Sequence, residues 1–100
     1  MNREQITWNL LHAFYEAWPE FKKSRRGISL DNAAAGYGPG ADLCGACISD
    51  LIDAGLVTPL LGGEGAITEE GRTVVSRILS APVESRPAEL AVVMKEVKLR

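Results

Sequence analysis

The segment from residue 51 to residue 72 places glycines and apolar runs in an order that few folds can accommodate. A helical pattern ends at Gly55, and glycine readily takes the left-handed conformation found just after a helix C-terminus. Apolar residues over 56–61 then predict a strand, the glycine-rich sequence 62–65 a hairpin turn, and 66–68 the returning strand. The order of helix, two-stranded hairpin and helix is therefore the strongest constraint on the fold.

The helix after the hairpin has a clear start signal. Thr68 is its predicted N-cap, and Glu69 and Glu70 lie in the first turn, where the helix dipole favours negative charge. Its buried face is predicted to consist of apolar side chains at helical spacing: Val74, Val75, Ile78 and Leu79.

An amphipathic helix is predicted near the N-terminus, from Arg3 to Phe21, because apolar residues recur there at steps of three and four. Pro19 marks its end or a kink. We interpret its large aromatic residues as core, with a subunit contact as the alternative: Trp8, Phe14, Trp18 and Phe21.

Two more helices are predicted before the hairpin. A short one runs through residues 33–35 after a candidate strand residue, Ile28, and either Ser29 or Asp31 could cap it. A glycine-rich turn over 36–40 follows. The next helix is expected over 41–54, with an apolar side made of Leu43, Cys44, Cys47, Ile48, Leu51, Ile52 and Ala54.

A chain of 100 residues suits a single domain. We expect the domain to span 1–81 and to be followed over 82–100 by a proline-bracketed linker and a last helix, from about residue 88 to 97. That helix is too short to be stable alone, so its apolar stripe must pack on the domain or on a second copy. The second alternative predicts a homodimer held by Leu90, Val93, Met94 and Val97.

Two stretches carry a family resemblance: Leu51-Ile52-Asp53-Ala54-Gly55-Leu56-Val57 and Ile67-Thr68-Glu69-Glu70-Gly71-Arg72. They resemble the L-x-x-x-G-L-V … (L/I)-T-x-x-G-R signature of winged helix-turn-helix regulators such as the MarR and PadR groups. The resemblance covers roughly residues 5–80 and implies a mainly α fold with a small β-hairpin, the wing. It also implies that the third helix contacts bases in the major groove of DNA.

The charge distribution departs from what that role requires. Residues 27–71 contain seven acidic residues and no Lys or Arg, so they carry −7, whereas 1–26 carry +2 and 72–100 carry +3. The predicted outward face of the third helix and the predicted wing tip share small or acidic side chains: Asp42, Ala46, Ser49, Asp50, Asp53 and Glu64. Phosphate binding needs cations there, so we expect this surface to bind a protein partner with a basic surface.

DNA binding is the alternative that the family resemblance favours. It would use a basic cluster composed of Lys22, Lys23, Arg25 and Arg26. A solvated basic loop is the simpler interpretation of the same residues.

No catalytic, cofactor or metal site can be assembled from the sequence. Cys44 and Cys47 have redox-motif spacing, and a position near a helix N-terminus would lower the pKa of Cys44, but a preceding strand and further zinc ligands are missing. We therefore interpret both as core residues. His12 has no obvious nucleophile beside it, and the glycines of 36–40 follow a predicted helix where a dinucleotide site needs a strand. We expect a protein that is not an enzyme.

The sequence also predicts where the protein resides. No apolar run approaches the ~20 residues of a membrane helix, and residues 1–5 are polar. Two cysteines are too few for a disulfide framework. We expect a cytoplasmic protein without a membrane partner.

Overall fold

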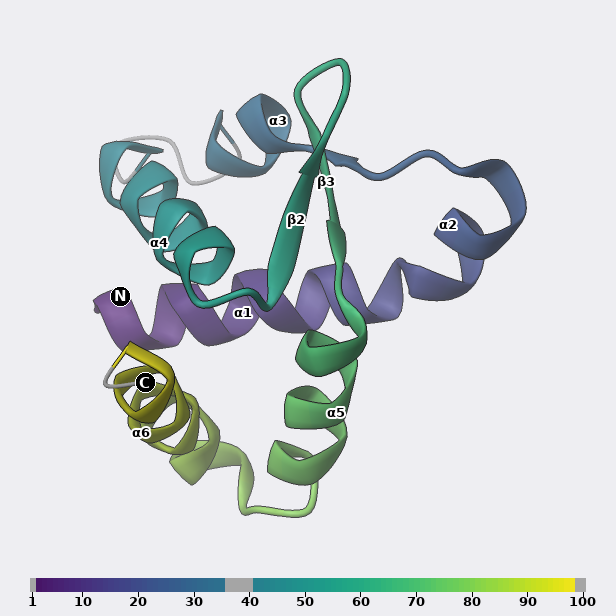
Figure 1. Ribbon diagram of the computed structural model, residues 1–100. Coiled ribbons are helices and arrows are strands. Elements are labelled where there is room, and N and C mark those ends of the chain that lie inside the picture. The colour runs from purple at the N-terminus through teal and green to yellow at the C-terminus, as the bar shows by residue number, and fades with distance from the viewer. Residues whose placement is uncertain (1, 36–40, 99–100) are drawn as a thin grey trace.

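The computed structural model describes residues 2–35 and 41–98 (Figure 1). The helices in these ranges are α1 (Arg3–Glu16), α2 (Trp18–Ser24), α3 (Leu30–Ala35), α4 (Ala41–Asp53), α5 (Glu69–Ile78), the 3-10 helix η2 (Val83–Ser85) and α6 (Arg86–Lys98). The strands are β1 (Ile28–Ser29), β2 (Val57–Leu60) and β3 (Glu64–Ile67). The prediction of a mainly α fold with a small β-hairpin is confirmed, and the turn expected over 36–40 lies outside the described residues. None of the described helices is both long and apolar enough to cross a bilayer.

The single N-terminal helix expected over 3–21 is wrong, because the chain forms two helices there. Helix α1 ends at Glu16, and α2 starts at Trp18 with Pro19 in its first turn. Proline lacks a backbone N–H and is tolerated only where no hydrogen bond to a preceding turn is needed. The loop expected from Lys22 is also shorter, since α2 continues to Ser24.

The sheet has three antiparallel strands in the order β1-β3-β2. Ile28 lies in β1, as predicted, and Ser29 and Leu60 are both register partners of Glu64 in the central strand. The hairpin tip is therefore Leu61-Gly62-Gly63, in which both glycines have positive φ, 83° and 75°. The expectation that Glu64 occupies the tip is wrong because the turn is one residue shorter than predicted.

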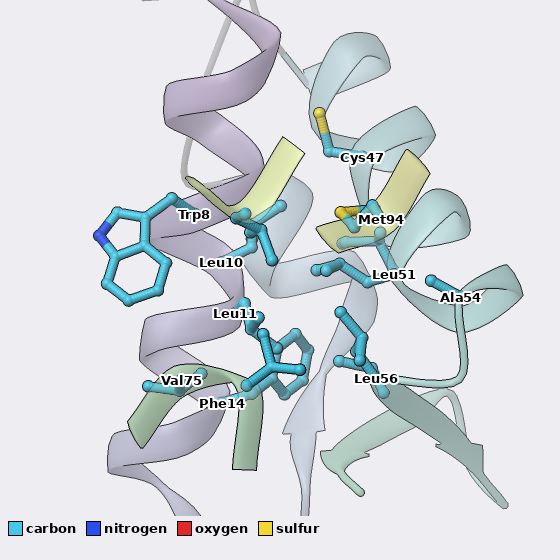
Figure 2. Packing of buried hydrophobic residues seen from close by; sticks show 14 of the residues in the cluster. Trp8, Leu10, Leu11, Phe14, Cys47, Leu51, Ala54, Leu56, Val75 and Met94 are labelled. Atoms are coloured by element: carbon cyan, nitrogen blue, oxygen red, sulfur yellow. The ribbon is translucent and has the colours of Figure 1, made fainter. Parts of the chain in front are cut away.

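The core lies around α1. Figure 1 shows α1 across the middle of the molecule, with α4 and the hairpin on one side and α5 and α6 on the other. Leu11 and Phe14 of α1 face Leu51 and Leu56, and all four are almost completely buried (Figure 2). Trp8 is buried as well, as predicted for the core, whereas Trp18 is only half-buried.

Thr68 joins the end of α4 to the start of α5. Its Oγ1 accepts a hydrogen bond from the Gly71 backbone N–H (3.0 Å), which confirms the predicted N-cap. The same hydroxyl donates to the Gly55 carbonyl oxygen (2.7 Å). Gly55 has the positive φ of 75° expected for the residue that reverses the chain after α4. The Thr68 side chain thus links the residue after α4 to the first turn of α5, the two ends between which the hairpin lies.

Helix α6 packs on the chain's own core. Leu90 is 1% exposed and Met94 is buried, while Val93 and Val97 are half-buried against the same cluster. The linker is shorter than expected, because α6 begins at Arg86 with Pro87 in its first turn. The Arg86 guanidinium donates to the carbonyl oxygens of Leu79 (3.0 Å) and Ala81 (3.1 Å) just beyond α5. The stripe therefore packs on the domain, one of its two predicted partners, and the homodimer stays a prediction.

Candidate functional site

The outward side of α4 carries the acidic face, which we define as Asp42, Ala46, Ser49 and Asp53. The three polar members are exposed, and Ala46 is partly exposed. The opposite side of the helix buries Cys44, Cys47, Ile48 and Leu51 in the core. Helical spacing places the two sets on opposite sides of α4. Burial of the apolar side in the core therefore turns the acidic side towards solvent.

Asp50 does not belong to this face, contrary to the prediction. Its Oδ2 lies 2.5 Å from Nη2 of Arg3 at the start of α1, and its side chain is only 22% exposed. This hydrogen bond and the carboxylate charge raise the pKa of the Arg3 guanidinium above its ordinary value. Sequence reasoning missed the pair because only the packing of α1 on α4 brings the two residues together.

Glu64 is also turned away from the predicted surface. Its Oε1 accepts a hydrogen bond from the Gly27 backbone N–H (3.3 Å), and the residue is partly buried at the start of β3. The exposed side chain at the hairpin tip is Leu61, which is 98% exposed. The tip is therefore apolar and uncharged, whereas an acidic tip was expected.

We expect opposite effects from the same charge reversal at the two ends of α4. Asp42 lies in the first turn and faces the positive end of the helix dipole, whereas Asp53 is the last residue and faces the negative end. Asp53→Lys should raise the free energy of unfolding by about 0.3–1 kcal/mol, and Asp42→Lys should lower it by a similar amount. Urea denaturation of both variants measures this. Equal shifts of the same sign would contradict the dipole explanation.

The two cysteines are core residues in the structure. Both are buried, and their thiols approach backbone oxygens, Cys44 that of Ala33 (3.7 Å) and Cys47 that of Arg3 (3.6 Å). Burial, with a smaller contribution from Cys47, raises the pKa of the Cys44 thiol. The lowering expected from a helix N-terminus is therefore wrong, because burial disfavours the charged thiolate. Cys44 stays a neutral thiol at neutral pH.

His12 lies within a row of aromatic rings on α1. Its ring stacks on Trp8, with centroids 5.2 Å apart, and lies 6.4 Å from Tyr15. Its Nε2 is 3.2 Å from Oε1 of Glu16, one turn further along the helix. These contacts place the histidine against aromatic neighbours at the edge of the helix. The spacing of four residues already allowed the pairing with Glu16.

A surface hollow at the junction of α1, α2 and α5 was not expected from the sequence. This aromatic hollow has a volume of about 360 Å³ and is lined by Tyr15, Glu16, Trp18, Pro19, Arg72 and Ser76. The Arg72 guanidinium carbon lies 3.8 Å from the centroid of the Trp18 ring, a cation–π contact. Trp18 also packs on Phe21, with centroids 5.4 Å apart. The break in the helix at Ala17 turns Trp18 towards α5 and so creates the hollow.

The basic cluster of Lys22, Lys23, Arg25 and Arg26 is exposed at the end of α2 and in the loop that follows. Arg25 is the left-handed residue after α2, with φ 61°. Figure 1 shows α2 on the opposite side of the hairpin from α4. The basic cluster and the acidic face are therefore separate surfaces.

Comparison with known proteins found no match. No family model fits the chain, and neither a curated protein nor a solved structure matches it.

Proposed function

We propose that the protein is a winged-helix interaction module that binds a protein partner with a basic surface, and that it is not an enzyme. The binding surface is the acidic face of α4 together with the hairpin tip. The observation that carries the proposal is the absence of Lys and Arg from residues 27–71, which leaves Asp42 and Asp53 exposed with no cation from their own segment. Arg3, a cation that reaches α4 from α1, is paired with Asp50 and so does not face the acidic face.

The order of the elements supports a winged-helix assignment. Helices α3 and α4 precede a hairpin, and α5 follows it directly. Within the two signature stretches, Gly55 reverses the chain after α4 and Thr68 caps α5, the roles predicted from their residue types. In this assignment α4 is the recognition helix, and β2, β3 and their turn are the wing.

Electrostatics favours a protein over duplex DNA as the occupant of this surface. A helix in the major groove lies between two phosphate backbones, and most of the non-specific affinity comes from cations that neutralise them. Asp42 and Asp53 would instead face those phosphates. The small side chain of Ala46 is partly exposed and lets another chain approach α4 closely. Leu61 is almost fully exposed and offers an apolar anchor to a partner. Both suit a protein interface with a basic rim.

Affinity capture from the native host tests the proposal. Wild type is compared with Asp53→Lys, and we expect proteins held by the acidic face to be lost or reduced at least about tenfold, as for an interfacial charge that meets an opposite charge. Asp53→Lys is chosen because it should stabilise the fold, so that lost binding cannot be attributed to unfolding.

Arg77→Gln is the matched control, since Arg77 is exposed on α5, away from α4. If Asp53→Lys combined with Asp42→Lys and Leu61→Ser captures the same proteins in the same amounts as wild type, the surface assignment is wrong.

The second candidate function is a DNA-binding regulator, and the exposed basic cluster on α2 favours it. It predicts salt-sensitive binding of random duplex DNA that is lost when Lys22, Lys23, Arg25 and Arg26 are all replaced by Gln. A gel shift at low and moderate salt separates this function from the first.

A further inference from the structure

The aromatic hollow combines two kinds of surface that recognise different parts of one ligand. Tyr15, Trp18 and Pro19 supply flat or apolar walls, and Arg72 supplies a cation. Its volume, about 360 Å³, falls within the roughly 300–1,000 Å³ of small-ligand sites. Glu16, the carboxylate among the lining residues, is turned to Nε2 of His12.

Arg72 is held in place but leaves its donors free. Its guanidinium lies over the Trp18 ring at 3.8 Å, and its side chain makes no hydrogen bond or ion pair with any residue in 2–35 or 41–98. A stacked guanidinium still presents its N–H groups at its edge, where they can bind a phosphate in a two-pronged arrangement. Stacking reduces the rotamer freedom that would be lost on binding, so Arg72 is preorganised for an anion.

Further cations continue from the hollow along α2. Pro19 lines the hollow, and Lys22 and Lys23 follow it three and four residues later, which places them one turn along on the same side of the helix. Arg25 and Arg26 come next. Within the described part of the chain, none of these four side chains has a hydrogen bond or ion pair.

From this arrangement we infer that the aromatic hollow and the basic cluster form a binding site for single-stranded nucleic acid. One unstacked base packs in the hollow beside Tyr15 and on the outer side of the Arg72 guanidinium, whose inner side covers the Trp18 ring. Its phosphate binds the N–H edge of Arg72, and the neighbouring phosphates lie along Lys22 and Lys23. Aromatic platforms beside a cationic track are the general means by which proteins hold single strands. The inference is independent of the acidic face, which lies on α4.

A single strand fits these residues better than other anionic ligands. In a duplex the bases are stacked inside, so the aromatic walls would have no counterpart. An acidic peptide would bind the cations through its carboxylates. It does not carry an aromatic ring beside each carboxylate, so the aromatic walls of the hollow would stay uncovered. Only a single strand offers alternating planar and anionic groups that match both surfaces.

Titration with an oligothymidylate of about 12 nucleotides, followed by tryptophan fluorescence, tests the inference. We expect quenching from Trp18, because the other tryptophan, Trp8, is buried. Trp18→Leu removes the reporter together with the ring on which Arg72 lies, so its binding is measured by fluorescence anisotropy of a labelled oligothymidylate, where we expect a loss of roughly 5- to 150-fold, the range measured for loss of one stacking platform. Arg72→Gln should weaken binding at least about tenfold, whereas Arg77→Gln on the same helix should change it less than about twofold.

The salt dependence tests the basic cluster separately. Replacing Lys22 and Lys23 by Gln should reduce the slope of log affinity against log salt by about 1.4, or about 0.7 per phosphate contact. Circular dichroism of each variant confirms the fold. The inference is overturned if wild type shows no quenching, if Arg72→Gln binds as wild type does, or if duplex DNA or polyglutamate competes as well as the single strand.

Discussion

Gly71→Ala is expected to destabilise the protein by about 3 kcal/mol or more, although helix propensity alone predicts a gain of about 1 kcal/mol. Gly71 lies in the first turn of α5 and is buried. A Cβ at this position would lie 2.2 Å from the Leu56 carbonyl oxygen and 2.7 Å from Cγ1 of Ile67. The first contact is with a backbone atom, which cannot rotate away as a side chain can. The clash is relieved only if α5 moves away from the base of the hairpin.

Gly45→Ala is the matched control. Gly45 lies within α4, and nothing would approach its Cβ within 4 Å. We expect a gain of about 0.5–1 kcal/mol, the ordinary propensity difference between alanine and glycine in a helix. Chemical denaturation of both variants measures the contrast. A stable Gly71→Ala variant would mean that α5 does not pack against Leu56 as closely as described.

Leu90→Ala is expected to lower the free energy of unfolding by about 2–5 kcal/mol, the usual cost of a cavity left by a buried leucine. Leu90 is 1% exposed and lies where α6 packs against α1 and α5. The loss should be the same at every protein concentration, because the contacts lie within one chain. Stability that depends on a second copy would instead rise with concentration.

Val92→Ala on the same helix provides the comparison, since Val92 is 56% exposed. It should change stability by no more than about 0.5 kcal/mol. If Leu90→Ala had a similarly small effect, and wild-type stability increased with concentration, the α6 stripe would belong to a dimer interface. Denaturation of the three proteins over a wide concentration range distinguishes the two arrangements.

Elements that depend on near neighbours were predictable from the sequence. The helix over 41–53, the reversal at Gly55 and the cap at Thr68 all occur where glycine, threonine and apolar spacing predicted them. Ser29 caps α3 by accepting a hydrogen bond from the Asn32 backbone N–H (3.3 Å). Of the two candidate caps, Ser29 and Asp31, the structure therefore uses Ser29. These features require only contacts within a few residues.

The candidate surfaces were predictable only in part. Asp42 and Asp53 are exposed as expected, because helical spacing opposite a buried stripe determines which side faces solvent. Asp50 and Glu64 were misplaced. Asp50 lies at the flank of α4, where Arg3 of α1 reaches it. The position of Glu64 depends on the length of the hairpin turn, which can differ by one residue for the same pattern of glycines and apolar residues.

By itself, the sequence determined the order of helices and strands from β1 to α5, the points at which the chain reverses, and the separation of an acidic middle from basic ends. The tertiary structure alone decided which charges are paired: Arg3 reaches Asp50, whereas Arg72 lies on Trp18 and has no anionic partner among residues 2–35 and 41–98. The reason is physical. Periodicity and capping act over one or two helical turns, whereas these contacts form only when helices from distant parts of the chain pack around α1.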